Sequence, residues 1–226
     1  MLYSDRNEKE AEDFIIKICD HLQIKKGSKT WDLACGNGRH TIALSKKELQ
    51  VTGSDLSNNN IETAKKYSQS KVEFFTHDMR EPFRINYFDV VFNLFTSFGY
   101  FENEKDNFKV FKNVHRSLKP NGIFVMDFFN SVKVRSSKFE PTSIKKNNID
   151  FHINKKFDSN TVCKTINFED MGQKYEFTEK VTLLELKDFK KLEKDSGLKM
   201  ISTFGNYSLE KFDPVNSERL IMIFQK

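Results

Sequence analysis

Short apolar runs alternate with longer stretches of helical periodicity through the first 130 residues. Runs rich in β-branched and aromatic residues are typical of buried strands, and they predict strands over Thr30–Ala34, Gln50–Ser54, Val72–Phe75, Phe88–Leu94 and Gly122–Phe128. The stretches between them predict helices over Glu8–Leu22, Ser57–Lys66 and Asn103–Leu118. This alternation predicts βαβ units, a mostly parallel sheet and helices on both of its faces.

The pattern changes after Phe129. Residues 133–148 are polar and irregular, so we predict a loop there. Partial alternation then predicts an antiparallel meander of three strands, over Asp150–Phe157, Val162–Phe168 and Lys174–Leu184, with hairpin turns between them. The last part returns to the first style and predicts a helix at Leu186–Ser196 and strands at Leu198–Phe204 and Arg219–Phe224. We expect one domain over residues 1–226, with residues 131–181 inserted into it.

Composition agrees with a globular, water-soluble chain. Of 226 residues, 38% are hydrophobic and 31% charged, and no apolar run approaches the ~20 residues that a membrane helix needs. The charged N-terminus has no apolar segment of the secretory kind, so we expect a cytoplasmic protein without membrane association. The net charge of +5 is mild and lysines alternate with acidic residues, which favours a mixed solvated surface over nucleic-acid binding.

Cysteine and histidine spacing argues against structural metal and disulfides. The three cysteines form no C-x-x-C pair, and the five histidines are scattered along the chain. We therefore expect neither a disulfide framework nor a metal site.

The chemically informative stretch is Asp32-Leu33-Ala34-Cys35-Gly36-Asn37-Gly38, at the end of the first predicted strand. Glycines in such a turn let a ligand approach the backbone, and the helix that follows offers free N–H groups to a polar or anionic group. Asp55 stands at the end of the second strand, where a carboxylate can accept hydrogen bonds from both hydroxyls of a ribose. A dinucleotide site is the rival interpretation, but Thr41 occupies the third glycine position of its fingerprint.

Together these motifs resemble those of class I S-adenosylmethionine-dependent methyltransferases. Asp32 to Gly38 is similar to the family's first motif, with Ala34 where glycine is commoner, and Asp55 matches its ribose-binding acid. Thr76-His77-Asp78-Met79 resembles the adenine-binding motif, in which the Asp78 carboxylate meets the exocyclic amine and the Met79 backbone closes over the ring. The resemblance implies a three-layer α/β fold with a seven-strand sheet and an antiparallel seventh strand. It also implies S-adenosylmethionine as cofactor.

Residue by residue, the resemblance implies a cofactor site and part of an acceptor site. The implied cofactor-binding residues are Asp32, Ala34, Gly36, Gly38, Arg39, Asp55, Leu56, Asp78, Met79 and Asn93. The segment leaving the fourth strand lies beside the methyl group in this family, so Phe95, Phe98 and Tyr100 become candidate acceptor contacts, with core packing as the alternative. Tyr3 is a further candidate to fold over the cofactor. The inserted residues 131–181 are then expected to form a β lid over the acceptor.

The sequence excludes some classes of methyl acceptor but does not identify the acceptor. The Asn-Pro-Pro-Tyr signature of enzymes that methylate nucleobase or glutamine amines is absent, as is a Pro-Cys nucleophile for cytosine-ring methylation. We therefore predict a small-molecule acceptor, methylated on nitrogen or oxygen mainly through proximity and orientation. No residue stands out as a general base, so the catalytic residue is unassigned. An RNA methyltransferase and a non-catalytic S-adenosylmethionine-binding regulatory module remain the alternatives, and oligomeric state is open.

Overall fold

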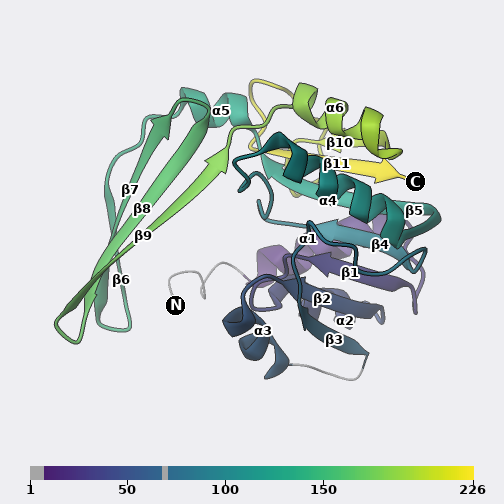
Figure 1. The fold of residues 1–226 in the computed structure, drawn as a ribbon, viewed down its shortest axis with the longest axis horizontal. Helices are drawn as coiled ribbons and strands as arrows, with labels where there is room; N and C mark the ends of the chain where they lie inside the picture. Colours follow the sequence, from purple (N-terminus) through teal and green to yellow (C-terminus); the bar gives the residue numbers. More distant parts are fainter. Residues whose placement is uncertain (1–7, 68–70) are drawn as a thin grey trace.

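The computed structural model describes residues 8–67 and 71–226. It has three layers, with a seven-stranded sheet between two layers of helices (Figure 1). The strand order is β10-β11-β5-β4-β1-β2-β3, and β11 runs antiparallel to both of its neighbours. The predicted fold class is confirmed. The strands are β1 (Lys29–Leu33), β2 (Gln50–Asp55), β3 (Val72–Thr76), β4 (Phe88–Asn93), β5 (Leu118–Phe129), β10 (Lys199–Phe204) and β11 (Arg219–Gln225).

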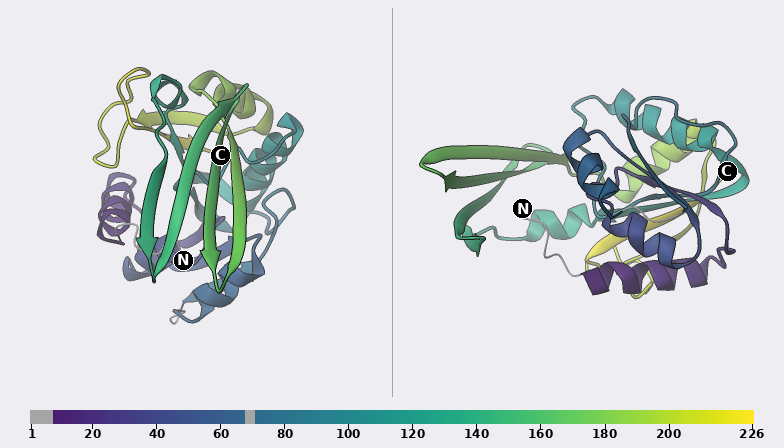
Figure 2. Two further views of the ribbon diagram at one scale, coloured as in Figure 1. Left: turned by 90° about the vertical axis from the view of Figure 1, so that its left-hand side faces the viewer. Right: turned by 90° about the horizontal axis from the view of Figure 1, so that it is seen from below.

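Helices cover both faces of this sheet, with α1 on one side and α4 and α6 on the other (Figure 2). They are α1 (Glu8–His21), α2 (Arg39–Lys46), α3 (Asn58–Lys65), α4 (Glu104–Ser117), α5 (Ser131–Ser136) and α6 (Leu186–Ser196). Ser57 caps α3 by accepting a hydrogen bond from the Asn60 amide, as the sequence predicts. None of the helices in the described part of the chain is long and apolar enough to cross a membrane.

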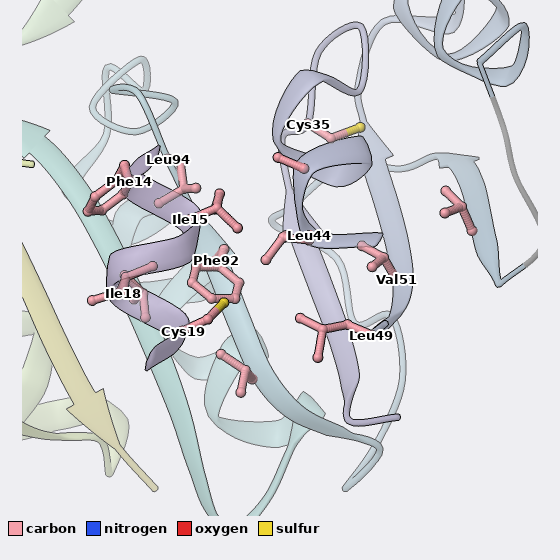
Figure 3. Close-up of a cluster of buried hydrophobic side chains, with 14 of the residues drawn as sticks. Phe14, Ile15, Ile18, Cys19, Cys35, Leu44, Leu49, Val51, Phe92 and Leu94 are labelled. Carbon is pink, nitrogen blue, oxygen red and sulfur yellow. The ribbon is translucent and has the colours of Figure 1, made fainter. Parts of the chain in front are cut away.

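Two apolar clusters stabilise the sheet, one on each face. On the first, Phe14, Ile15 and Ile18 of α1 pack toward Phe92 and Leu94 at the end of β4 (Figure 3). On the second, aromatic rings of β5, α4, α6 and β11 interlock, with Phe111 packing edge-on against both Phe124 and Phe224. The polar residues at the carboxyl edge of the sheet are therefore held by strands that are fixed on both faces.

β5 begins four residues earlier than expected. Leu118 pairs with Phe88, but the next pair joins Val90 to Ile123, so Lys119–Gly122 bulges out of the ladder. Asn121 has φ +62° in this bulge. The helix predicted to end at Leu118 ends at Ser117, and the Pro120-Asn121-Gly122 sequence that follows forms a bulge within β5.

A second, four-stranded antiparallel sheet lies between β5 and α6 in the chain and projects away from the main sheet (Figures 1 and 2). It consists of β6 (Thr142–Lys146), β7 (Ile149–Asp158), β8 (Thr161–Asp170) and β9 (Gln173–Thr182). The three meander strands and both hairpin turns are confirmed by the pairing register.

The predicted loop over residues 133–148 is wrong. Its start lies in α5, which Asn130 caps through the Val132 amide, and its later part contains β6, paired with β7. β6 is exposed along nearly its whole length, so it shows no apolar alternation in the sequence. Hydrogen bonding to β7 rather than burial holds it in place, as is usual for a polar edge strand.

Candidate cofactor and acceptor site

The turn after β1 has an unusual backbone that explains its sequence. Ala34, Gly36 and Gly38 all have positive φ, of +61°, +55° and +82°. Gly38 is the N-cap of α2, and a Cβ there would lie 2.9 Å from the Phe74 ring and 3.1 Å from Ala64. Only glycine fits both the conformation and the space at this position. Ala34 tolerates the same region at some cost, which accounts for the preference for glycine there.

The N-terminus of α2 is open to a ligand. Within the described residues, Gly38 provides no side-chain cap for the first-turn amides. A Cβ on Gly36 would have no atom within 4 Å, so the turn borders open space. The N-terminal end of a helix beside open space suits a polar or anionic ligand group.

Asp55 joins this turn to the end of β2. Its Oδ2 accepts a hydrogen bond from the Gly36 amide at 2.8 Å, and its Oδ1 accepts from the Ser57 amide at 2.9 Å and from Asn60 Nδ2 at 3.1 Å. A carboxylate has about four acceptor positions, so Oδ2 keeps one for a ligand hydroxyl. A second hydroxyl would have to displace the Asn60 amide.

Asp32 is buried beneath the turn and accepts a 2.6 Å hydrogen bond from the Thr41 hydroxyl. Burial raises the pKa of its carboxyl to about 6, although the Thr41 hydrogen bond acts in the opposite direction. The Asp32 side chain is therefore charged near neutral pH at a cost to folding, as expected of a group retained for binding rather than stability.

This burial predicts a pH dependence of stability. The carboxyl of an unfolded chain has a pKa near ~3.9, so between about pH 4 and 6 the unfolded state loses its proton first. The free energy of unfolding should fall over this window by an Asp32 contribution of about 3 kcal/mol, and level off above it. Urea unfolding of the wild type and Asp32→Asn from pH 4 to 7.5 measures the difference. Parallel pH profiles for the two proteins would contradict the assignment.

Asp78 follows β3 at the same edge, but its carboxylate is already engaged. Arg80 donates from its amide at 2.9 Å to Asp78 Oδ1 and from Nη2 at 2.6 Å to Oδ2. Hydrogen bonding by Arg80 lowers the pKa of Asp78, so the carboxylate is ionised and partly neutralised. A role at an adenine amine requires it to keep this ion pair while accepting one more hydrogen bond. Met79 is half-buried against the second core cluster.

Asn93 ends β4 directly beside the β1 turn. It is fully buried and donates from Nδ2 to the Leu33 carbonyl at 2.9 Å. Its Oδ1 has no hydrogen-bond partner within the described residues. A buried orphan acceptor of this kind calls for a ligand donor or a water molecule.

The segment that leaves β4 is strained. Phe95 and Thr96 have φ of +62° and +58° in succession, which non-glycine residues rarely adopt. The Ser97 hydroxyl donates to the Leu94 carbonyl at 3.0 Å and lies 3.4 Å from the Ala34 carbonyl, so this segment is fastened to the β1 turn. Strain that the surroundings maintain is a feature of functional loops.

The three aromatic acceptor candidates have different environments. The Arg39 guanidinium lies over the Phe95 ring, 4.8 Å from its centroid. Tyr100 is half-exposed, and its hydroxyl donates to the Thr96 carbonyl at 3.2 Å. Phe98 is fully buried among core rings, including Phe189, so the structure favours its core alternative over an acceptor contact.

The remaining cofactor candidates lie around the same turn. Leu56 is 68% exposed directly after Asp55, where an apolar side chain can cover a flat ligand ring. Arg39 begins α2, and its Nη2 lies 3.4 Å from His40 Nε2. Burial lowers the pKa of His40 to about 3, so this imidazole is neutral. Tyr3 lies outside the described residues. Within the described residues, no cluster of three or more His, Cys, Asp or Glu side chains could hold a metal ion.

The sequence reasoning missed three residues at this edge. Asp127 of β5 and Arg219 of β11 form a buried ion pair at 2.8 Å, and Tyr207 donates to the same carboxylate at 3.0 Å. The signal in the sequence that could have identified Asp127 is its position as a lone carboxylate in the apolar run Phe124–Phe129.

The family model described as a methyltransferase domain matches residues 31–126, which run from β1 to Met126 of β5. Residues 31–126 therefore belong to the methyltransferase domain family, and the chain has the fold of S-adenosylmethionine-dependent methyltransferases. The matched stretch contains the glycine turn, Asp55, Asp78 and the segment leaving β4. The predicted family is therefore confirmed.

Curated relatives match slightly less than half of this chain. The chain is 39% identical over 106 residues to a putative methyltransferase of Bacillus subtilis, YqeM, covering 46% of this chain and 43% of that protein. It is 38% identical over 114 residues to the demethylmenaquinone methyltransferase of Staphylococcus epidermidis, covering 48% and 46%. The match spans less than half the length of either relative.

Solved structures match nearly the whole chain. A methyltransferase of Clostridium acetobutylicum superposes with a TM-score of 0.84 at 21% identity, covering 100% of this chain and 94% of that one. A sugar N-methyltransferase of a Streptoalloteichus species gives a TM-score of 0.76 at 14% identity, covering 97% and 89%. At these identities the likeness shows that the fold, with its second sheet, is shared.

Proposed function

We propose that this protein transfers a methyl group from S-adenosylmethionine to a nitrogen or oxygen of a small molecule. The observation that carries the proposal is the 2.8 Å hydrogen bond from the Gly36 amide to Asp55 Oδ2, which holds a carboxylate suited to ribose hydroxyls beside the turn that leads into α2. The demethylmenaquinone methyltransferase and the sugar N-methyltransferase named above, both similar to this chain, act on small molecules by their names.

The residues present fit S-adenosylmethionine. Asp55 Oδ2 retains an acceptor position for a ribose hydroxyl, and exposed Leu56 can cover the adenine. The positive end of the α2 dipole suits the carboxylate of the methionine part, and the carboxylate of buried Asp32 suits its ammonium group. When bound, the cofactor supplies an electrophilic methyl group on a sulfonium.

The chain's own contribution is then alignment and exclusion of water. Asn93 and the strained Phe95–Thr96 segment lie where the β4 strand ends, beside the turn that would hold the cofactor. Alignment of two reactants in a dry site supplies large effective concentrations. No described residue is assigned as a general base, which suits an acceptor that arrives as a neutral amine or as an acidic hydroxyl.

The four-stranded sheet is proposed to be the lid of the acceptor pocket. β9 is attached to the segment leaving β4, because the Thr182 amide donates to the Gly99 carbonyl at 2.8 Å and a Cβ on Gly99 would lie 3.2 Å from Val181. The four-stranded sheet is therefore attached at the carboxyl edge of the main sheet, where open α/β sheets bind their ligands.

Methyl transfer tests the proposal directly. The purified protein is incubated with methyl-labelled S-adenosylmethionine and panels of small amines, amino sugars, carboxylic acids and hydroxylated aromatics, with structured RNA as a separate arm. We expect label in a small-molecule fraction, and none with Asp55→Ala. Label in RNA alone would support an RNA methyltransferase. Cofactor binding without transfer in any arm would support a regulatory module.

A further inference from the structure

A buried ion pair joins β5 to β11 beneath the segment that leaves β4. Arg219 Nε donates to Asp127 Oδ1 at 2.8 Å, and Asp127 is only 1% exposed. Removing two charges from water costs more than their attraction commonly returns, and apolar replacements of such pairs are often neutral or stabilising. A contribution to folding stability therefore does not by itself explain why an ion pair is present at this place.

Both members of the ion pair form hydrogen bonds with the short segment that leaves β4. Asp127 Oδ2 accepts from the Phe95 amide at 2.9 Å, and the Asp127 carbonyl accepts from the Thr96 amide at 3.1 Å. Arg219 Nη2 donates to the Thr96 hydroxyl at 3.0 Å. Both members of the pair thus bind the two consecutive residues that have left-handed backbone conformations.

Tyr207 connects the same carboxylate to α1. Its hydroxyl donates to Asp127 Oδ2 at 3.0 Å, and its ring packs 4.7 Å from that of Phe14. Burial raises the pKa of Tyr207, and the neighbouring Asp127 carboxylate adds to the effect, so the phenol stays protonated and keeps donating. The ion pair is therefore itself fixed from the α1 side.

The Phe95–Thr96 segment lies beside the turn after β1. Phe95 and Thr96 follow Asn93 and precede Ser97, whose hydroxyl lies 3.4 Å from the Ala34 carbonyl of the β1 turn. Two left-handed residues in succession are unfavourable without support, so the segment should leave this conformation when its hydrogen bonds are removed.

We propose that Asp127 and Arg219 are positioning residues, which hold Phe95 and Thr96 in the conformation that binds the sulfonium end of the cofactor and presents it to the acceptor. This inference rests on the proposed function, because it concerns the same site. It assigns a role to two residues that lie outside the glycine turn and the ribose and adenine motifs.

The test separates positioning from stability. In Asp127→Leu/Arg219→Met, apolar side chains replace the pair but leave the Phe95 amide and the Tyr207 hydroxyl without this acceptor, so we expect a cooperative unfolding transition with a melting temperature lowered by about 5–15 °C. We expect S-adenosylhomocysteine to bind at least tenfold more weakly by calorimetry. The control is Asp89→Asn/Lys119→Gln, which removes an ion pair between β4 and β5 at the opposite edge of the sheet and should leave the affinity unchanged.

A second variant keeps the test decisive if the double variant fails to fold. Thr96→Val removes the hydroxyl that Arg219 binds and leaves the ion pair intact. We expect at least threefold weaker S-adenosylhomocysteine binding at an unchanged melting temperature. Affinities of Thr96→Val and of a folded double variant within twofold of wild type would overturn the inference. If wild-type protein itself bound no S-adenosylhomocysteine, the proposed function would fail first, and this inference with it.

Discussion

Removal of the four-stranded sheet should abolish methyl transfer and leave cofactor binding nearly intact. The cofactor candidates are in the turn after β1, at the ends of β2 to β4 and at the start of α2. Strands β6 to β9 follow the carboxyl end of β5 in the chain and are attached to the segment leaving β4 through Thr182 and Gly99, both of which the deletion keeps. Replacing residues 142–180 with a short Gly-Ser linker therefore opens the acceptor side alone. We expect kcat/KM for an accepted substrate to fall at least ~1000-fold, because alignment and exclusion of water are lost.

The effect of the deletion on turnover is compared with its effect on cofactor affinity. S-adenosylhomocysteine should bind the shortened protein within about threefold of wild type, since loss of the lid removes no cofactor contact. Met171→Ser is the control, because this side chain is 99% exposed in the distal β8–β9 turn and its variant should keep full turnover. An equal loss of affinity and turnover after the deletion would mean that the second sheet supports the whole domain.

Replacement of Asp55 by alanine should weaken S-adenosylmethionine binding by at least ~100-fold. The change removes a charged acceptor for ribose, and each hydrogen bond to a charged group contributes about 1.5–3 kcal/mol. It also removes the acceptor that holds the Gly36 amide and the two donors at the start of α3. Calorimetric titration of the variant measures the loss.

Two matched variants separate these effects. Asp55→Asn keeps one acceptor oxygen, and we expect an affinity between those of wild type and Asp55→Ala. Asp89→Ala removes the same charge at the amino end of β4 and should bind as wild type does. Equal affinities of all four proteins would show that Asp55 does not contact the cofactor.

The central strands of the main sheet are predictable from sequence because they are buried on both faces. Phe88–Asn93 and Arg219–Gln225 are almost continuous apolar runs, so these two strands can be recognised from their local composition. The first motif is equally legible, since Gly38 cannot be replaced without a clash with Phe74. Its local sequence therefore reflects its local structure.

Features that depend on long-range pairing are not visible in the sequence. β6 is a polar edge strand that is paired with β7 and exposed along most of its length, so residues 142–146 give no periodic signal. Asp127 and Arg219 are 92 positions apart, and only the adjacency of β5 and β11 brings them together. Phe98 likewise sits in a functional motif by sequence and in the core by structure, because Phe111 and Phe189 enclose it.

The most direct test of the central claim is calorimetric titration of S-adenosylmethionine and S-adenosylhomocysteine into the wild-type protein. We predict one site per chain with micromolar-range affinity for both ligands, strongly weakened in Asp55→Ala. Absence of binding of either ligand by well-folded protein would contradict the account, and the turn from Asp32 to Gly38 would then have to serve another nucleotide.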